Sequence, residues 1–233
     1  MPELWTCNAG TVDYRTAVDL QERLRARVIA GDLPDLLLLL EHPPVYTLGR
    51  RSEPGDLPFG EDHWRAQGID VVRTQRGGKL TYHGPGQLVG YPIMRVGDVP
   101  EFVATMERAI VGALAETGLE ARARSAEGRD FTGVWVEDRK IASIGVHISR
   151  GVSAHGFAVN VTNDLAPFTW VVACGLPSVS MTSLALEGSP DDVPCFRKRM
   201  AFTFARTFGR RQRLVTPRRL GIGAREPVGT LDP

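Results

Sequence analysis

The sequence predicts an α+β fold, with helices packed against a mixed, mostly antiparallel β-sheet. Three long segments carry apolar residues at helical spacing, and the stretches between them are short, extended and separated by glycine or proline. With 233 residues, of which 42% are hydrophobic and 24% charged, the chain is long enough to bury one substantial core. We expect a single domain over residues 1–233, with a loosely held Arg/Pro/Gly-rich tail from about residue 217.

Three segments are predicted to be helices. Residues 13–31 form the first, and Gly31 is placed to end it. Residues 99–118 show the clearest helical period and end at Gly118. Residues 189–209 form the last, and Pro194 should restrict its regular part to the residues after the proline. The inward faces are expected to consist of Ala17, Leu20, Leu24, Val28; Phe102, Val103, Met106, Ile110, Leu114; and Phe196, Met200, Phe204.

The intervening segments are predicted to be strands. Residues 35–50, DLLLLLEHPPVYTLGR, indicate a buried strand, a Pro-Pro break and a second extended piece. Residues 69–94 indicate strands joined by tight glycine turns. Residues 132–151 indicate a hairpin that turns around Glu137 to Lys140, and residues 154–164 a further strand.

Composition excludes several classes of protein. A formal net charge of +1 does not indicate a nucleic-acid-binding protein. Three cysteines in a chain of this length do not form a disulfide framework, which favours a reducing compartment. The N-terminal residues lack the basic and long apolar regions of a signal peptide, and the longest apolar run, Leu36 to Leu40, is too short to span a bilayer. We expect a cytoplasmic protein with no membrane partner.

The stretch RGGKLTYHGPGQLVGYP, residues 76–92, combines many glycines with strand-like residues. Strand alternation places Lys79, Thr81 and His83 on one face, with Leu80 and Tyr82 on the other. Glycine within a sheet marks close approach of another backbone or of a ligand, so a plain hairpin and the wall of a site are equally supported. A phosphate-binding loop is less favoured, because neither GxxxxGK[ST] nor GxGxxG occurs.

This stretch is similar to the signature of the lipoyl(octanoyl) transferases, whose fold resembles the catalytic domain of lipoate and biotin protein ligases. The similarity extends from EHPPVYTLGR to ACGLPSVSMTSL and fades toward the C-terminus. The fixed positions that match are Arg76, Gly77, Gly78, Thr81, Tyr82, His83, Gly86, Gln87 and Tyr91.

The resemblance implies an acyltransferase. Such an enzyme moves an octanoyl group from octanoyl-acyl carrier protein to a specific lysine of lipoyl domains, through a cysteine thioester. The implied acceptors are the lipoyl domains of 2-oxoacid dehydrogenases and the H protein of glycine cleavage. No cofactor and no metal are expected, since no His/Cys/Asp cluster has ligand spacing. No heptad pattern demands a dimer, so a monomer is expected.

The positions that match the family's nucleophile and its lysine partner are Cys174 and Lys140. Before the cysteine, this chain has Ala173 where the family often has proline. A lysine ammonium beside a thiol favours the thiolate, and the same lysine can later accept a proton from an attacking amine. Arginine could not easily release a proton, and lysine occurs only at positions 79, 140 and 198 of this arginine-rich chain. Taken without the resemblance, Cys174 would be an inert buried thiol and Lys140 a solvated residue of a turn.

The resemblance also assigns substrate contacts to three stretches. Phe157 is a plausible wall for the acyl tail or a core aromatic residue. His83 could orient Lys140, polarise the thioester carbonyl or only hold the turn, and backbone N–H groups near Gly145 or Gly175 could stabilise an oxyanion. The predicted contacts are Arg76, Gly77, Gly78, Lys79, Leu80, Thr81, Tyr82, His83, Ser143, Ile144, Gly145, Gly156, Phe157 and Ala158. The other titratable candidates are expected to be structural or loop residues: Cys7, Cys195, His42, His63, His147 and His155.

Two other functions remain open. An ATP-dependent lipoate or biotin-type ligase would need a phosphate-gripping loop and no nucleophilic cysteine. A lipoyl-carrier binding module without chemistry would tolerate any residue at positions 140 and 174. Three short basic runs are candidate docking patches for acidic partners, or simply solvated surface. They are Arg50-Arg51, Arg197-Lys198-Arg199 and Arg210-Arg211.

Overall fold

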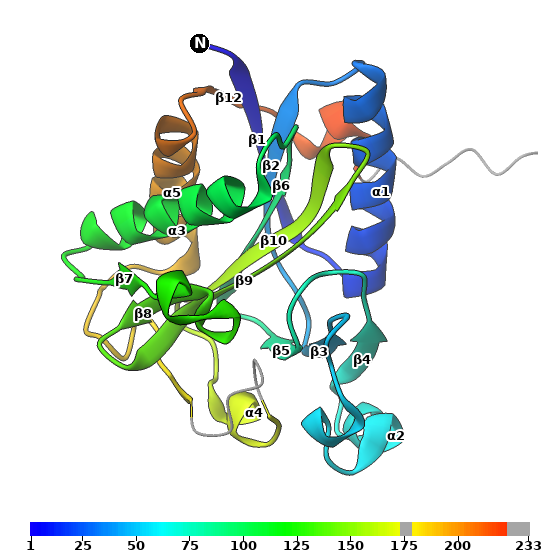
Figure 1. Cartoon of the computed structure of the whole chain (residues 1–233), viewed down its shortest axis with the longest axis vertical. Helices are drawn as coiled ribbons and strands as arrows, with labels where there is room; N and C mark the ends of the chain where they lie inside the picture. The colour runs from blue at the N-terminus through cyan, green and yellow to red at the C-terminus, as the bar shows by residue number, and fades with distance from the viewer. Residues whose placement is uncertain (173–178, 223–233) are drawn as a thin grey trace, which may run out of the picture.

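In the computed structural model, which describes residues 1–172 and 179–222, a large twisted sheet lies between helices, and a smaller sheet sits at one end (Figure 1). The strand order of the large sheet is β12-β1-β2-β6-β10-β9-β8-β7, and β11 pairs with β9 outside this path. The strands are β1 Glu3–Thr11, β2 Asp35–Glu41, β6 Gln87–Ile93, β7 Arg122–Ala123, β8 Gly133–Val136, β9 Arg139–Ser149, β10 Val152–Asn160, β11 Ser180–Met181 and β12 Arg211–Leu214.

The large sheet is mostly antiparallel, as predicted. Parallel pairing occurs between β12 and β1, between β1 and β2, and between β11 and β9. Every other neighbouring pair of its described strands runs antiparallel. The β8–β9 hairpin turns at Glu137, whose φ of 52° lies in the left-handed region, and this confirms the predicted hairpin.

The leucine run of β2 is buried because both faces of this strand are covered. Leu37 and Leu39 belong to the core on the side of α3 (Val99–Ala115) and α5 (Val193–Thr207). Leu36, Leu38 and Leu40 belong to a second core under α1 (Tyr14–Ala30). Because neither face of β2 contacts solvent, no alternate position favours a polar side chain, and this explains the uninterrupted apolar sequence.

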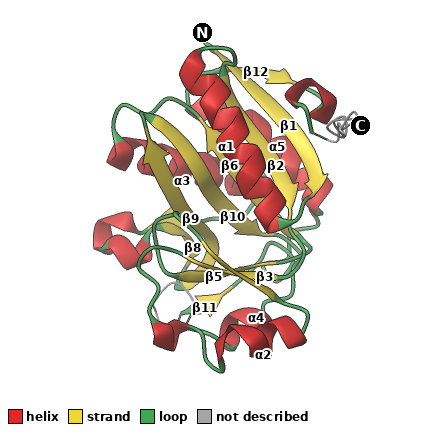
Figure 2. Cartoon of the chain, turned by 90° about the vertical axis from the view of Figure 1, so that its right-hand side faces the viewer, coloured by secondary structure: helices red, strands yellow, loops and turns green. Residues whose placement is uncertain are grey.

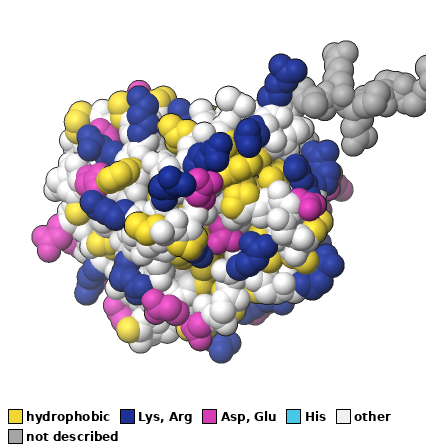
Figure 3. Space-filling model, turned by 90° about the horizontal axis from the view of Figure 1, so that it is seen from above, with side chains coloured by type: hydrophobic (Ala, Val, Ile, Leu, Met, Phe, Trp, Pro, Cys, Tyr) yellow, Lys and Arg dark blue, Asp and Glu magenta, His cyan; other side chains and the backbone are white. Residues whose placement is uncertain are grey.

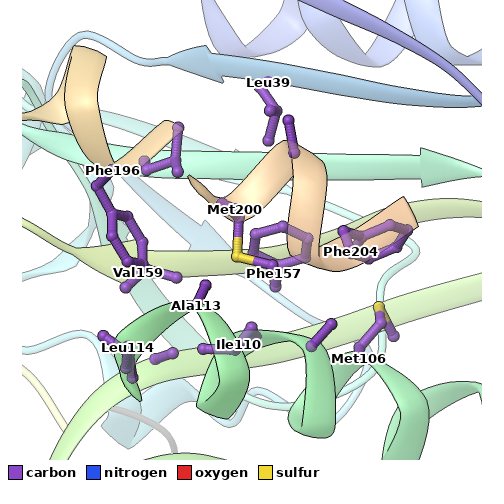
Figure 4. Packing of buried hydrophobic residues seen from close by; sticks show 14 of the residues in the cluster. Leu39, Met106, Ile110, Ala113, Leu114, Phe157, Val159, Phe196, Met200 and Phe204 are labelled. Atoms are coloured by element: carbon purple, nitrogen blue, oxygen red, sulfur yellow. The ribbon is translucent and has the colours of Figure 1, made fainter. Parts of the chain in front are cut away.

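The helical faces predicted from the sequence are the buried ones. In α3, Phe102, Met106, Ile110 and Leu114 are at most 6% exposed, while Val103 is half-buried at the edge of the core. They meet Phe196, Met200 and Phe204 of α5 over the sheet residues Phe157 and Val159 (Figure 4).

Caps define the helix ends. The Asp13 side chain accepts a hydrogen bond from the Thr16 N–H, and Gly31 ends α1 with a left-handed φ of 88°. Asp192 caps α5 in the same way, and the helix begins at Val193. Pro194 therefore lies inside the first turn, where its missing N–H has no intrahelical partner to lose, rather than ahead of the regular helix.

A smaller sheet, in the order β4-β3-β5, was not predicted as a separate unit. Its strands are β3 Val45–Leu48, β4 Asp70–Arg73 and β5 Leu80–His83, and it packs against the short helices α2 (Gly60–Ala66) and α4 (Ala166–Thr169). Figure 2 shows β3 and β5 below the large sheet, with α1 lying across that sheet above them.

Of the two interpretations of residues 76–92, the plain hairpin is wrong. β5 pairs with β3, whereas β6 pairs with β2 and β10, so the Gly84-Pro85-Gly86 turn carries the chain from one sheet to the other. Gly86 has a φ of 86°, and an added Cβ there would lie 2.7 Å from the Asn163 amide nitrogen. Glycine is needed at this crossing because the backbone passes close to another segment in a conformation that side chains disfavour.

Within the tail predicted from about residue 217, Pro217–Leu220 forms a 3₁₀ turn, and Leu220 is 4% exposed against the core under α1. The remainder, residues 223–233, lies outside the described residues. Among residues 1–172 and 179–222, the helices are all too short or too polar to cross a bilayer.

Candidate active site

A cavity of about 660 Å³ lies where the small sheet meets the large one. Its walls come from the segment leading into β5, from β9 and β10, and from the first turns of α3 and the two 3₁₀ turns Ser125–Glu127 and Arg129–Phe131. This volume is within the range of sites that enclose a small ligand. Most of the interior is apolar and includes Val89, Val103, Ile144, Phe157 and Ala158.

The cavity brings together nearly all of the substrate contacts predicted from the sequence. Residues 76–83 meet two paired stretches of the β9–β10 hairpin on its walls. The residues of that prediction that line the cavity, together with Lys140, are Arg76, Gly77, Gly78, Lys79, Leu80, Thr81, His83, Ser143, Ile144, Gly145, Gly156, Phe157 and Ala158.

Tyr82 is the exception among these predicted contacts. Its ring packs edge-on against Tyr46, with centroids 5.6 Å apart, and against Phe168 at the same separation. Tyr82 lies on the face of β5 opposite Thr81 and His83, as strand alternation requires, so it belongs to the core of the small sheet.

Lys140, the second residue of β9, is 2% exposed. Its Nζ lies 5.2 Å from the centre of the Trp135 ring, and among the described residues its ammonium group makes no ion pair with a carboxylate. Met181 of β11 pairs with Lys140, and the Thr182 N–H donates to the Lys140 carbonyl over 3.0 Å. The predicted turn therefore does not expose this lysine, because pairing on both sides buries it at the cavity wall.

The glycines at the cavity are required by close approach of backbones. The Gly77 N–H donates to the Val146 carbonyl over 2.9 Å, and a Cβ added at Gly145 would lie 2.8 Å from the Gly77 oxygen. A Cβ at Gly156 would overlap the carbonyl oxygen of Gly90, and one at Gly90 would overlap the Phe157 ring. Glycine thus allows the segment before β5, β9, β10 and β6 to converge around one space.

Arg76 shapes the cavity wall from within. Its Nε donates to the Thr47 hydroxyl oxygen over 3.1 Å, its second terminal nitrogen donates to the Thr47 carbonyl over 2.5 Å, and the first donates to the Gly77 carbonyl over 3.0 Å. Because these bonds join β3 to the segment before β5, we interpret Arg76 mainly as a brace of the small sheet.

Buried histidines and tyrosines lie at the cavity and beside it: Tyr14, His83, Tyr91 and His155 line it, whereas His42 does not. His42 belongs to a connecting segment, as predicted, but is fully buried, and its Nε2 lies 2.7 Å from the Tyr91 hydroxyl. His155 is 6% exposed and has a φ of 58°, in the left-handed region. His63 lies in α2 rather than in a loop. Burial lowers the pKa of His42 to about 4 and, helped by nearby Arg76, that of His155 to about 3.

These neutral histidines predict that stability falls on acidification. The unfolded chain protonates His42 and His155 below about pH 6.5, while the folded chain resists protonation down to about pH 4, so the free energy of unfolding decreases across that interval. For His42 alone the loss from pH 7 to pH 5 is about 2 kcal/mol. We expect urea unfolding at pH 7 and pH 5 to show a smaller loss of stability for His42→Gln than for the unaltered protein, by about 2 kcal/mol. The exposed α2 variant His63→Gln should behave as the unaltered protein, and equal losses in all three proteins would contradict the assignment.

Several cavity residues were not predicted. Tyr91 is a fixed position of the signature, so the sequence carries a signal for it without indicating a role. Tyr14, Val99 and Thr132 reach the cavity from separate segments and carry no local signal. Their presence depends on how α1, α3 and the 3₁₀ turns pack around the two sheets.

Two of the three cysteines can be placed. Cys7 is 1% exposed in the core under α1, and burial raises the pKa of its thiol to about 11. Cys195 is exposed at the start of α5, and the Asp192 carboxylate beside it raises the pKa of its thiol. Cys174 and Ala173 lie outside the described residues. The described residues that flank them make defined contacts: the Val172 N–H donates to the Asp56 carbonyl, and Met181 pairs with Lys140.

Several arginines of the predicted docking patches form ion pairs with acidic side chains. Figure 3 shows lysine and arginine side chains interspersed with acidic and apolar ones on that face. Arg51 pairs with Asp130 over 3.0 Å at the cavity, and Arg199, Arg210 and Arg211 each form an ion pair with a carboxylate. The predicted docking patches are therefore partly neutralised by neighbouring acids.

Comparison with known proteins identifies the family. Residues 13–205 match the family model described as the lipoyl protein ligase A/B catalytic domain. An octanoyltransferase of Solibacter usitatus is 47% identical over 207 residues, which cover 85% of this chain and 90% of that protein. An octanoyltransferase of Mycobacterium ulcerans is 48% identical over 190 residues, covering 76% of each chain.

Solved structures support the fold at lower identity. A lipoate-protein ligase A bound with ATP superposes with a TM-score of 0.74 at 18% identity, covering 93% of this chain and 89% of that one. A lipoate protein ligase of Thermoplasma acidophilum superposes with a TM-score of 0.71 at 17% identity, covering 93% of this chain and 88% of that one. The chain therefore belongs to the lipoyl protein ligase A/B catalytic domain family and, by its curated relatives, to the octanoyltransferases within it.

Proposed function

We propose that this protein transfers an octanoyl group from octanoyl-acyl carrier protein to a specific lysine of lipoyl domains, as the first step of endogenous protein lipoylation. The acyl group passes through a thioester on Cys174, with Lys140 as the partner of the thiol. The acceptors are lipoyl domains of 2-oxoacid dehydrogenases and the H protein of glycine cleavage. We also propose a cytoplasmic monomer that needs no cofactor.

In the first half-reaction, the Cys174 thiolate attacks the carbonyl carbon of the donor thioester. A new C–S bond forms, the oxyanion collapses, and the carrier thiolate leaves with the electron pair of the broken C–S bond. One thioester replaces another, so this exchange needs no external source of energy. The Lys140 ammonium stabilises the thiolate before the attack and can return a proton to the departing sulfur.

In the second half-reaction, the neutral amine of the acceptor lysine attacks the Cys174 thioester. A C–N bond forms, the C–S bond breaks, and the attacking nitrogen loses a proton to Lys140 in its neutral form. The amide product is more stable than the thioester, which makes this step favourable without ATP. Burial of about seven CHₙ groups of the octanoyl tail against the apolar cavity wall contributes about 5–6 kcal/mol to binding.

The observation that carries the proposal is the position of Lys140. It is a buried lysine with no carboxylate partner in the described part of the chain, and it lies on the wall of a largely apolar cavity. A buried ammonium without a counter-charge is costly unless a bound group or a nearby anion compensates it. The raised pKa values of Cys7 and Cys195 leave Cys174 as the better candidate for a reactive thiolate.

The ATP-dependent ligase is the alternative, and it can be tested directly. The protein should be incubated with octanoyl-acyl carrier protein in the absence of ATP and its intact mass measured. We expect the mass of one octanoyl group to be added, to be lost on treatment with hydroxylamine, and to map to the peptide containing Cys174. An adduct that forms only with free octanoate and ATP would favour the ligase, and binding of lipoyl domains without any adduct would favour a binding module.

A further inference from the structure

A chain of buried hydrogen bonds connects His83 with the strand that carries Lys140. His83 Nδ1 lies 2.7 Å from Gln87 Oε1, and Gln87 Nε2 donates to Asn160 Oδ1 over 2.9 Å. Asn160 Nδ2 donates to the Thr182 carbonyl over 2.9 Å, and the Thr182 N–H donates to the Lys140 carbonyl. The chain passes from β5 through β6 and β10 to the segment after β11, and so crosses from the small sheet into the large one.

The directions of these bonds show which nitrogen of the His83 ring carries a proton. Gln87 Nε2 faces two oxygens, the Tyr82 carbonyl at 3.3 Å and Asn160 Oδ1, so the amide nitrogen must point toward them. Gln87 Oε1 then faces His83, and since an amide oxygen only accepts, Nδ1 of the ring must donate. Nδ1 therefore carries a proton, and in the neutral ring Nε2 then carries a lone pair.

The surroundings keep His83 neutral and leave Nε2 available. His83 is 6% exposed and stacks on Tyr14, with ring centroids 5.8 Å apart. Burial, reinforced by His42, Arg76 and His155, lowers its pKa well below the ordinary value, although the bond to Gln87 opposes this shift. Within residues 1–172 and 179–222, the bond to Gln87 is the one hydrogen bond found for this ring, while the residue lines the cavity.

A neutral ring with its proton on Nδ1 excludes one of the roles considered for His83. A lone pair cannot donate a hydrogen bond to a thioester carbonyl or to its oxyanion, so His83 does not polarise the substrate carbonyl through Nε2. Such a lone pair can accept a hydrogen bond from an N–H group. Among the reacting groups that octanoyl transfer brings into the cavity, the one with N–H hydrogens is the amine of the acceptor lysine.

We propose that Gln87 and Asn160 are positioning residues, which hold His83 in the Nδ1-protonated tautomer so that its Nε2 accepts a hydrogen bond from the attacking amine in the second half-reaction. This inference rests on the proposed function. The hydrogen bond orients the amine's lone pair toward the thioester carbon, and Lys140 remains the group that takes the proton. Asn160 accepts a hydrogen bond from Gln87 and so fixes its orientation. Asn160 also donates to the Thr182 carbonyl, and this connects the His83 side of the network to the backbone of Lys140.

The first test is spectroscopic and needs no activity. Imidazole ¹⁵N shifts of His83, assigned with the aid of a His83→Gln variant, should show a protonated Nδ1 and an unprotonated Nε2 between pH 6 and 8. A protonated Nε2, or an imidazolium ring, would overturn the proposal even if octanoyl transfer is confirmed. If the protein forms no octanoyl adduct at all, the proposed function fails on that separate measurement.

The second test is kinetic. Gln87→Met keeps the length of the side chain but removes its hydrogen bonds to His83, Tyr82 and Asn160, so we expect mixed tautomers of His83. Single-turnover transfer from octanoyl-enzyme to a lipoyl domain should slow tenfold or more, while formation of the octanoyl-enzyme should change less than threefold. Asn160→Ser, which shortens the second link, should act in the same direction and serves if Gln87→Met does not fold.

Thr203→Val is the matched control for the kinetic test. Thr203 is also a buried polar residue, 1% exposed, but it bonds Glu116 from α5 and does not line the cavity. Its loss should lower stability and leave both half-reactions unchanged. Parallel slowing of the two half-reactions in Gln87→Met, or an unchanged tautomer in that variant, would show that Gln87 is merely structural.

Discussion

Replacement of Cys174 by alanine is expected to lower octanoyl transfer by at least about 10³-fold while the protein remains folded. Without the sulfur no enzyme thioester can form. The acceptor amine would then have to attack the carrier thioester directly, and the cavity would accelerate that reaction only by binding the octanoyl group. Steady-state octanoylation of a lipoyl domain measures the rate of transfer, and the intact mass of the enzyme shows whether the thioester still forms. Cys174→Ser should also lose activity, because a serine hydroxyl beside a lysine is a much weaker nucleophile than a thiolate.

Two matched variants control for the loss of a thiol. Cys195→Ala removes an exposed cysteine outside the cavity, and Cys7→Ala removes a buried one. The first should transfer octanoyl groups at the normal rate, and the second should lose stability rather than activity. A near-normal rate for Cys174→Ala would refute the assignment of the nucleophile.

Replacement of Lys140 by arginine is expected to separate the two half-reactions. Arginine keeps the positive charge that stabilises a thiolate but does not readily accept a proton, so transfer to the acceptor should slow by about 10²-fold or more, whereas octanoyl-enzyme should still form. Lys140→Met, which loses both charge and base, should impair both steps. Rapid-quench measurement of each half-reaction distinguishes these outcomes.

The tight surroundings of Lys140 require a control for packing. Its side chain lies over the Trp135 ring and close to Gly133, so thermal unfolding of each variant must show that the fold is kept. Lys198→Arg, at an exposed position of α5, is the conservative comparison and should not change either step. Equal slowing of both half-reactions in Lys140→Arg would count against separate roles in thiolate stabilisation and proton transfer.

Much of the fold is predictable from local pattern. The apolar spacing of α1, α3 and α5 predicts the buried faces, because a helix at the surface turns its apolar stripe toward the core whatever elements it packs against. The β8–β9 hairpin and the buried run of β2 are predictable in the same way. For the candidate site, the glycine-rich signature together with the stretches around Ser143 and Phe157 accounts for most of the cavity wall.

The sequence by itself determined the three long helices, the β8–β9 hairpin and the faces that are apolar, because these properties depend on neighbouring residues. The stretches that line the cavity were implied by the resemblance of the sequence to the octanoyltransferases. Only the tertiary structure decided that β5 and β6 lie in different sheets, that Lys140 is buried, and that Gln87 orients the His83 ring. Strand partners and the direction of a buried hydrogen bond depend on residues far apart in the chain, such as Thr47 opposite Thr81, and local periodicity contains no information about such distant pairs.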